Sequence, residues 1–118
     1  MRGKRIIIDY VQDMYDNALK AMQFTSDMDF ETFERNEQVQ YAVVRALEIV
    51  GEAAKQIPGE TQQEYPQIPW RSVTGMRNKL IHAYFGVDLF VVWRTVKEDL
   101  PTLAAQLKNM RDEMGSDV

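Results

Sequence analysis

The spacing of apolar residues constrains the fold of this chain more than any other feature. Apolar residues recur at intervals of three and four along most of the 118 residues, which is the period of one face of an α-helix. No segment alternates with the period of two that indicates a strand. We therefore expect an all-α fold: an antiparallel bundle of four main helices and one short extra helix, formed by a single domain over residues 1–118.

Capping residues, glycines and prolines set the expected helix ends. Asp29 suits the N-cap of the short helix and Asp88 that of the last helix, while Gly86 ends the helix before it. Pro101 lies within the last helix, which should be kinked or divided there. The expected helices cover residues 6–24, 30–33, 36–57 and 69–85 and a last segment from Asp88, with the longest loop through Pro66 and a frayed tail after Met110.

Each long helix carries an apolar stripe that we expect to face the core. Gly51 lies within the helix expected over residues 36–57, where a glycine costs about 1 kcal/mol relative to alanine. We therefore expect Gly51 to permit a close approach of another helix. The stripes are Ile7, Val11, Met14, Ala18, Ala21 and Met22; then Val39, Val43, Leu47, Val50, Ala54 and Ile57; then Leu89, Val92, Trp93, Val96, Leu100, Leu103 and Leu107.

The composition excludes several classes of site. The chain has no cysteine and one histidine, which excludes a disulfide scaffold, a thiol nucleophile and a Cys-based or multi-His metal site within one chain. No apolar run approaches the roughly 20 residues of a membrane span, and the apolar stretch after Lys4 and Arg5 is too short for a signal peptide. We expect a cytoplasmic protein with no membrane partner, no metal site and no cofactor of its own.

Charge is unevenly distributed along the chain. The net charge is −4, but residues 71–97 hold five basic residues and one acid, so this window carries +4 and the rest of the chain −8. A local basic surface can recruit phosphate even on an acidic protein, although a solvated helix face is the simpler interpretation. The basic residues are Arg71, Arg77, Lys79, Arg94 and Lys97, and the only histidine, His82, lies among them.

One stretch inside this window combines side chains that could cleave RNA. Arg77, Asn78, Lys79, His82 and Tyr84 lie within eight residues. RNA cleavage needs a group that takes the proton of the 2′-hydroxyl and a group that protonates the leaving 5′-oxygen, and histidine suits both roles. Arginine can stabilise the charge that builds on the phosphate oxygens. The RNA supplies its own nucleophile, so the reaction needs no serine, cysteine or metal.

Helical spacing alone does not bring these side chains together. Asn78 and Lys79 share a face with His82, and Arg77 aligns with Tyr84, but Arg77 and His82 lie roughly 140° apart on an ideal helix. A long arginine side chain, a distorted helix or a second copy of the chain could each close this gap. A lone histidine near a helix end can also be purely structural, and Tyr84 can be a core or interface residue.

The same stretch resembles the Arg-x4-His-x-Tyr motif of the HepT family, within the HEPN superfamily. The similarity covers nearly the whole chain, from DYVQDMYDNALKAMQFTSDMDFETF through VVRALEIVGEAAK to YPQIPWRSVTGMRNKLIHAYFGVDLFVVWRTVKEDLP. The Arg-x4-His core alone is a weak pattern. With the surrounding Pro69-Trp70-Arg71, Gly75-Met76, Gly86-Val87-Asp88 and Val92-Trp93 in register, the match is specific.

The resemblance implies a function and a site. HepT proteins are homodimeric toxins of type VII toxin–antitoxin pairs and act as metal-independent ribonucleases, with transfer RNA the expected target. Their antitoxin, the nucleotidyltransferase MntA, uses ATP to attach AMP to the motif tyrosine and so silences the toxin. Carried over to this chain, Arg77 and His82 would be catalytic and Tyr84 would accept AMP. Asn78 and Lys79 would lie beside the RNA substrate.

Two alternatives come from other functional classes. The chain could be a non-catalytic HEPN partner of a nucleotidyltransferase that binds nucleotide or substrate. It could also be a helical interaction module without ligand chemistry, because its apolar stripes fit an ordinary bundle core and dimer interface as well. The presence of Arg77, His82 and Tyr84 together favours the ribonuclease.

Overall fold

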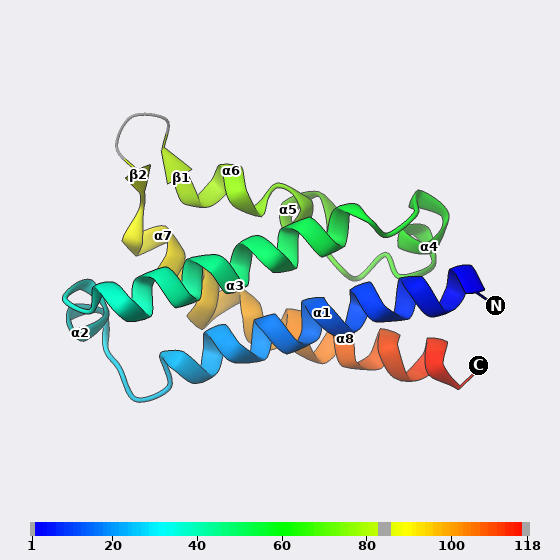
Figure 1. Ribbon diagram of the computed structural model, residues 1–118, viewed down its shortest axis with the longest axis horizontal. Coiled ribbons are helices and arrows are strands. Elements are labelled where there is room, and N and C mark those ends of the chain that lie inside the picture. Colours follow the sequence, from blue (N-terminus) through cyan, green and yellow to red (C-terminus); the bar gives the residue numbers. More distant parts are fainter. Residues whose placement is uncertain (1, 83–85, 117–118) are drawn as a thin grey trace.

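Four antiparallel helical legs make up the molecule (Figure 1). The computed structural model describes residues 2–82 and 86–116, and for Arg2, Ile81 and His82 it describes the backbone alone. The legs are formed by α1 (Arg2–Phe24), by α3 (Glu37–Lys55), by α5 (Trp70–Thr74) with α6 (Met76–Leu80), and by α7 (Leu89–Arg94), the π-helix η1 (Thr95–Asp99) and α8 (Leu100–Gly115). The short α2 (Phe30–Glu34) and α4 (Gly59–Glu64) lie at opposite ends of the bundle.

The expected all-α bundle is confirmed, and so are the caps of its helices. The Asp29 carboxylate accepts a hydrogen bond from the Thr32 backbone N–H, at 2.8 Å, and so caps α2. The Asp88 carboxylate caps α7 by accepting from the N–H groups of Phe90 and Val91, both at 3.1 Å. These bonds satisfy backbone donors that have no partner within the helix, which is why each helix begins where it does.

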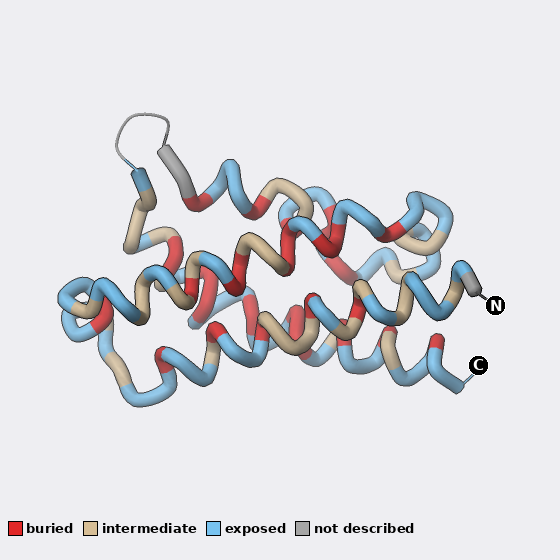
Figure 2. The backbone as a smooth tube through the Cα atoms, viewed as in Figure 1, coloured by how far each residue is buried: buried red, intermediate tan, exposed pale blue. Residues whose placement is uncertain are grey.

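The predicted apolar stripes meet along the length of the bundle. α1 packs against both α3 and α8, and the buried positions of all three face one another (Figure 2). Most stripe residues are buried, and the partly exposed ones, such as Ile7 and Val39, lie near helix ends. No helix in the described part of the chain is long and apolar enough to cross a membrane.

A close contact at Gly51 joins the third leg to α3. A Cβ atom added at Gly51 would lie 3.2 Å from the Cβ of Met76 and 3.2 Å from the backbone oxygen of Val73. Met76 and Val73 are themselves almost fully buried. The expectation that Gly51 permits a close helix approach is therefore confirmed, and the approaching leg is the one that contains the Arg77 motif.

Two expectations about regions without regular structure are wrong. The long loop before Pro66 contains the helix α4, and the indole N–H of Trp70 holds its end by donating to the backbone oxygens of Gln62 and Tyr65. The chain does not fray directly after Met110. α8 continues to Gly115 because Met114 is buried and extends the apolar stripe by one more turn.

The helix expected over residues 69–85 is also wrong in its second half. It bends at Gly75, ends at Leu80 and passes into the strand β1 (Ile81–His82), which pairs antiparallel with β2 (Gly86–Val87). The prediction that the chain has no strand is therefore wrong as well. Gly86 has φ +73°, a backbone conformation that favours glycine, and the Asp88 N–H donates to the Leu80 backbone oxygen at 2.9 Å. The described part of this segment is a hairpin rather than a helical turn.

The last leg is divided as predicted, though the irregular turn precedes Pro101. Proline has no backbone N–H and its ring clashes with the carbonyl four residues earlier, here that of Lys97. The π-helix η1 covers Thr95–Asp99, so Pro101 falls in the first turn of the new helix α8, where proline is tolerated.

We expect replacement of Gly51 by valine to destabilise the fold. The added atoms meet the backbone oxygen of Val73 and the Cβ of Met76, and neither can rotate away. Overpacking of this kind costs about 1–3 kcal/mol of unfolding free energy, measured by denaturant titration. Gly3→Val is the matched control, because Gly3 lies in α1 with no atom within 4 Å of an added Cβ. Equal stability of the two variants would contradict the close contact.

Candidate functional site

The helix α6 presents the first residues of the predicted motif to solvent. Met76 and Leu80 are buried, four residues apart, and anchor α6 on the core. The three residues between them, Arg77, Asn78 and Lys79, are all exposed. The Arg77 side chain is exposed and has no ion-pair partner within the described ranges.

The remaining motif residues lie at the helix end and beyond it. The His82 backbone belongs to β1 and pairs with Gly86, while its side chain and all of Tyr84 lie outside the described residues. Because α6 ends at Leu80, the angle of roughly 140° that an ideal helix would put between Arg77 and His82 does not apply. The helix ends between the two residues, so their relative direction does not follow from helical spacing.

Lys79 is held by an acid that the sequence did not single out. Its ammonium lies 3.1 Å from an Asp99 carboxylate oxygen, and both side chains are partly exposed. Asp99 ends the π-helix η1, twenty positions along the chain. The only sequence signal was the nearby Pro101, which predicted an irregular turn but not its contact with α6. The ion pair connects the motif helix to the last leg of the bundle.

The five basic residues of the charged window have different surroundings. Lys79 pairs with Asp99, and Arg94 pairs with Glu98 through a 2.8 Å contact. Two acids that follow the basic window in the sequence therefore contact two of its basic residues in the structure. The hydrogen bond and the charge of Glu98 raise the pKa of the Arg94 guanidinium above its ordinary value. Arg71 and Arg77 are exposed, and neither has an ion-pair partner in the part of the chain that the structure describes. The basic surface is therefore narrower than the sequence indicates.

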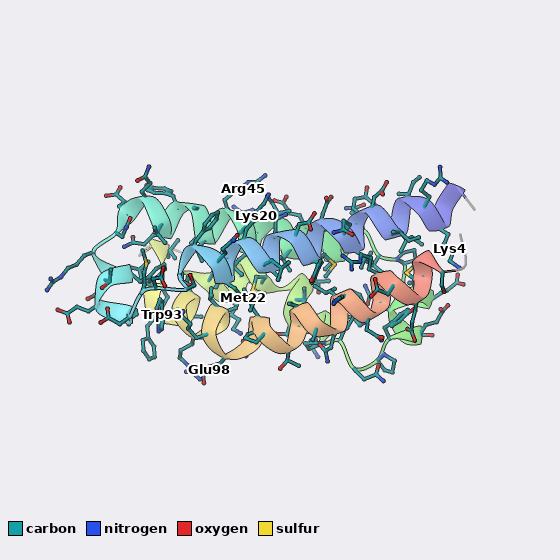
Figure 3. The ribbon with its side chains drawn as sticks, turned by 90° about the horizontal axis from the view of Figure 1, so that it is seen from below. Lys4, Lys20, Met22, Arg45, Trp93 and Glu98 are labelled. Carbon is teal, nitrogen blue, oxygen red and sulfur yellow. The ribbon has the colours of Figure 1, made fainter. Side chains whose placement is uncertain are left out.

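Aromatic rings gather where α2 meets α7, beside this charged surface. The rings of Phe30 and Phe90 are perpendicular with centroids 5.5 Å apart, and Phe33 lies 5.3 Å from Trp93. The Lys97 ammonium lies 4.7 Å from the centre of the Trp93 ring and donates to the Thr25 backbone oxygen at 2.8 Å. Figure 3 shows Trp93 next to α2 and Glu98 pointing outward from the bundle. Sequence reasoning counted Trp93 as core and did not consider Phe90.

A groove lies between the first half of α3 and the segment formed by β2 and the start of α7. It has a volume of about 750 Å³, and its walls are Glu34 and Arg35, the first half of α3, and the residues Gly86, Val87 and Leu89. Tyr41 of α3 lines it and is 71% exposed. Among the side chains that the structure describes, no three His, Cys, Asp or Glu residues are grouped so that they could hold a metal ion.

Comparison with known proteins identifies the family. The family described as "Ribonuclease HepT-like" matches residues 14–110. The "Probable ribonuclease HepT" of Thermococcus cleftensis is 47% identical over 108 residues, which cover 92% of this chain and 98% of the relative. The "Putative RNase MJ1216" of Methanocaldococcus jannaschii is 42% identical over 115 residues, which cover 97% of this chain and 95% of the relative. No solved structure gives a significant match. The resemblance seen in the sequence is confirmed: this chain belongs to the ribonuclease HepT-like family.

Proposed function

We propose that this chain is a metal-independent endoribonuclease and the toxin of a type VII toxin–antitoxin pair, with transfer RNA as its main target in the cytoplasm. Membership of the ribonuclease HepT-like family supports the RNase activity, because the match covers residues 14–110 and relatives of similar length are named as ribonucleases. The transfer RNA target and the toxin role rest on the resemblance to HepT proteins.

The observation that carries this proposal is the position of Arg77. It is an exposed arginine without an ion-pair partner in the described ranges. It lies on the five-residue helix α6, which ends three residues later at Leu80 and is followed directly by the strand that contains His82. A cation that no protein acid neutralises can contact a phosphate without first breaking an ion pair. The ends of short helices and strands also suit catalytic residues, because a rigid scaffold positions them while leaving them open to substrate.

The roles of the residues follow from the chemistry of the reaction. The 2′-oxygen of the RNA forms a bond to phosphorus while the bond from phosphorus to the 5′-oxygen breaks. Arg77 stabilises the negative charge that builds on the phosphate oxygens, and His82 transfers a proton to or from the sugar oxygens. Asn78 and Lys79 are exposed next to Arg77, where they would contact the RNA beside the cleaved bond.

A homodimer would supply the second proton-transfer group. Each chain has one histidine, while the reaction needs one group that accepts a proton and one that donates a proton. Two His82 side chains that face one cleft would fill both roles. The hairpin lies at one end of the molecule, so two copies can join at this end without unfolding either bundle.

The activity is regulated at Tyr84. An MntA-like nucleotidyltransferase transfers AMP from ATP to the phenol oxygen of Tyr84, and pyrophosphate leaves. The added phosphate carries a negative charge into the site and competes with RNA for Arg77, by the same electrostatic reasoning that applies to phosphorylation. Tyr84 lies two residues after His82, so the bulky nucleotide also obstructs access to it.

Replacement of Arg77 or His82 by alanine should abolish cleavage and toxicity. Loss of one group that stabilises the charged transition state lowers a rate by about 10²–10³-fold, and loss of a proton-transfer group has a similar effect. The measurement is growth after induction of each variant in bacteria, with total RNA on a gel, followed by cleavage of purified transfer RNA in the presence of EDTA.

The matched control for Arg77→Ala is Arg71→Ala. Arg71 is also exposed and without an ion-pair partner in the described part of the chain, but it belongs to α5, before the bend at Gly75. We expect Arg71→Ala to lower the rate by less than about tenfold, because it removes long-range attraction only. Harmless growth and intact RNA with the unmodified wild-type chain would contradict the proposal and favour a non-catalytic partner of a nucleotidyltransferase.

Tyr84→Phe should separate cleavage from regulation. Phenylalanine keeps the ring but lacks the oxygen that accepts AMP. Coexpression with the cognate nucleotidyltransferase should add the mass of one AMP to the wild-type chain and none to the variant, which should stay toxic. Tyr41→Phe controls for general loss of a tyrosine, because Tyr41 is exposed on α3. Modification of the Tyr84→Phe chain, measured by intact-protein mass spectrometry, would place the acceptor elsewhere.

A further inference from the structure

We propose that Phe90 and Arg94 form a binding subsite for one unpaired base of single-stranded RNA, next to the helix that contains Arg77. This inference rests on the proposed ribonuclease function and extends it by naming the substrate class: the chain binds RNA through an unpaired nucleotide beside the cleavage site. Neither residue belongs to the Arg-x4-His-x-Tyr motif.

Phe90 has the geometry of a stacking platform. It is 54% exposed, and the perpendicular ring of Phe30 supports it at 5.5 Å between centroids. The guanidinium carbon of Arg94 lies 5.9 Å from the Phe90 ring centre, so a planar cation and an aromatic ring are next to each other at the surface. Unpaired bases stack on aromatic rings and on arginine planes in proteins that bind single-stranded RNA.

Two adjoining hollows connect this platform to α6. Phe90, Trp93, Arg94, Lys97 and Glu98 line a hollow of about 440 Å³. A second hollow of about 300 Å³ is also lined by Arg94 and Glu98, and it reaches Lys79. RNA that contacts Phe90 can therefore continue over Arg94 to the helix on which Arg77 lies.

The charges along these hollows suit a phosphate backbone. Lys79, Arg94 and Lys97 line them together with two acids, Glu98 and Asp99, so this surface is positive by one on a chain of net charge −4. Arg94 and Glu98 are both mostly exposed, and exposed ion pairs contribute little to stability. A phosphate can therefore take the place of Glu98 on Arg94 at small cost.

The groove that contains Tyr41 is less suited to RNA, although Tyr41 is more exposed than Phe90. Its lining includes three acids, Glu34, Glu37 and Glu48, and two arginines. With three acids and two arginines, this lining carries a net charge of −1, against +1 for the hollows beside Phe90. The charge of this groove therefore disfavours a phosphate backbone, and Tyr41 provides a control of matched chemistry.

The test measures RNA binding separately from cleavage. The full chain with His82→Ala serves as the non-cleaving background for every variant. Fluorescence anisotropy gives the Kd for a labelled single-stranded oligonucleotide and for a duplex of the same sequence, at one salt concentration. We expect Phe90→Ala to weaken single-strand binding about tenfold or more, which is the effect of losing one stacked base, and to change duplex binding by less than about twofold. Phe90→Trp should restore binding because it keeps the ring.

Three further measurements assign the contact to the ring and its neighbour. Tyr41→Ala should leave single-strand binding unchanged. An abasic nucleotide at the stacking position should weaken binding to the parent chain but not to Phe90→Ala, because both changes remove the same contact. Phe90→Ala should keep the salt dependence of the parent, whereas Arg94→Ala should reduce its slope because one phosphate contact is lost.

Each contrary result overturns a defined statement. If Phe90→Ala and Phe90→Trp both bind like the parent, or if Tyr41→Ala weakens binding instead, the subsite is wrong. If Phe90→Ala changes the oligomer mass by light scattering and leaves the Kd unchanged, Phe90 is a contact between protein chains. If the wild-type chain cleaves RNA but its binding does not depend on Phe90, this inference is wrong and the proposed ribonuclease function stands. Phe90-dependent binding without cleavage removes the proposed ribonuclease and leaves the subsite.

Discussion

The contact between Gly51 and Met76 determines where the candidate site can lie. Because Gly51 has no side chain, the third leg approaches α3 closely enough for Met76 to be buried at the contact. Burial of Met76 and Leu80 turns the intervening residues outward and fixes the direction of α6. The Leu80 carbonyl then accepts from Asp88, whose carboxylate begins α7. The contact at Gly51 therefore determines the position of both strands of the hairpin, through Leu80 before the first strand and Asp88 after the second.

The sequence predicts the parts of the fold that follow from periodicity. Stripes such as Val43, Leu47 and Val50 are long enough to define a helix face, and their burial was predicted residue by residue. The two-residue strands β1 and β2 are too short to produce an alternating pattern, so the helical period of the preceding residues extended over them. Gly86 was recognised as a helix end, although its positive φ serves a hairpin.

In the candidate site too, the sequence predicts what depends on local spacing but not what depends on packing between distant segments. The exposure of Arg77 follows from local spacing between buried neighbours, and its identity follows from the motif. The pairing of Lys79 with Asp99 depends on how η1 packs against α6, which no short segment reveals. Counting charges over residues 71–97 also left out Glu98 and Asp99, although both acids contact basic residues of that window in the folded chain. Charge counted along a sequence therefore overestimated the positive surface, because Lys79 and Arg94 each contact an acid while Arg71 and Arg77 have no ion-pair partner in the described ranges.

The arrangement of the chain ends has a consequence for how this protein can be handled or joined to others. The first turn of α1 and the last turn of α8 lie side by side at one end of a molecule 46 Å long, and the hairpin lies toward the other end (Figure 1). A purification tag, a surface tether or a fused domain at either end would therefore project away from the hairpin. The chain can be immobilised through α1 or α8 with the face that bears Arg77 still open to large ligands.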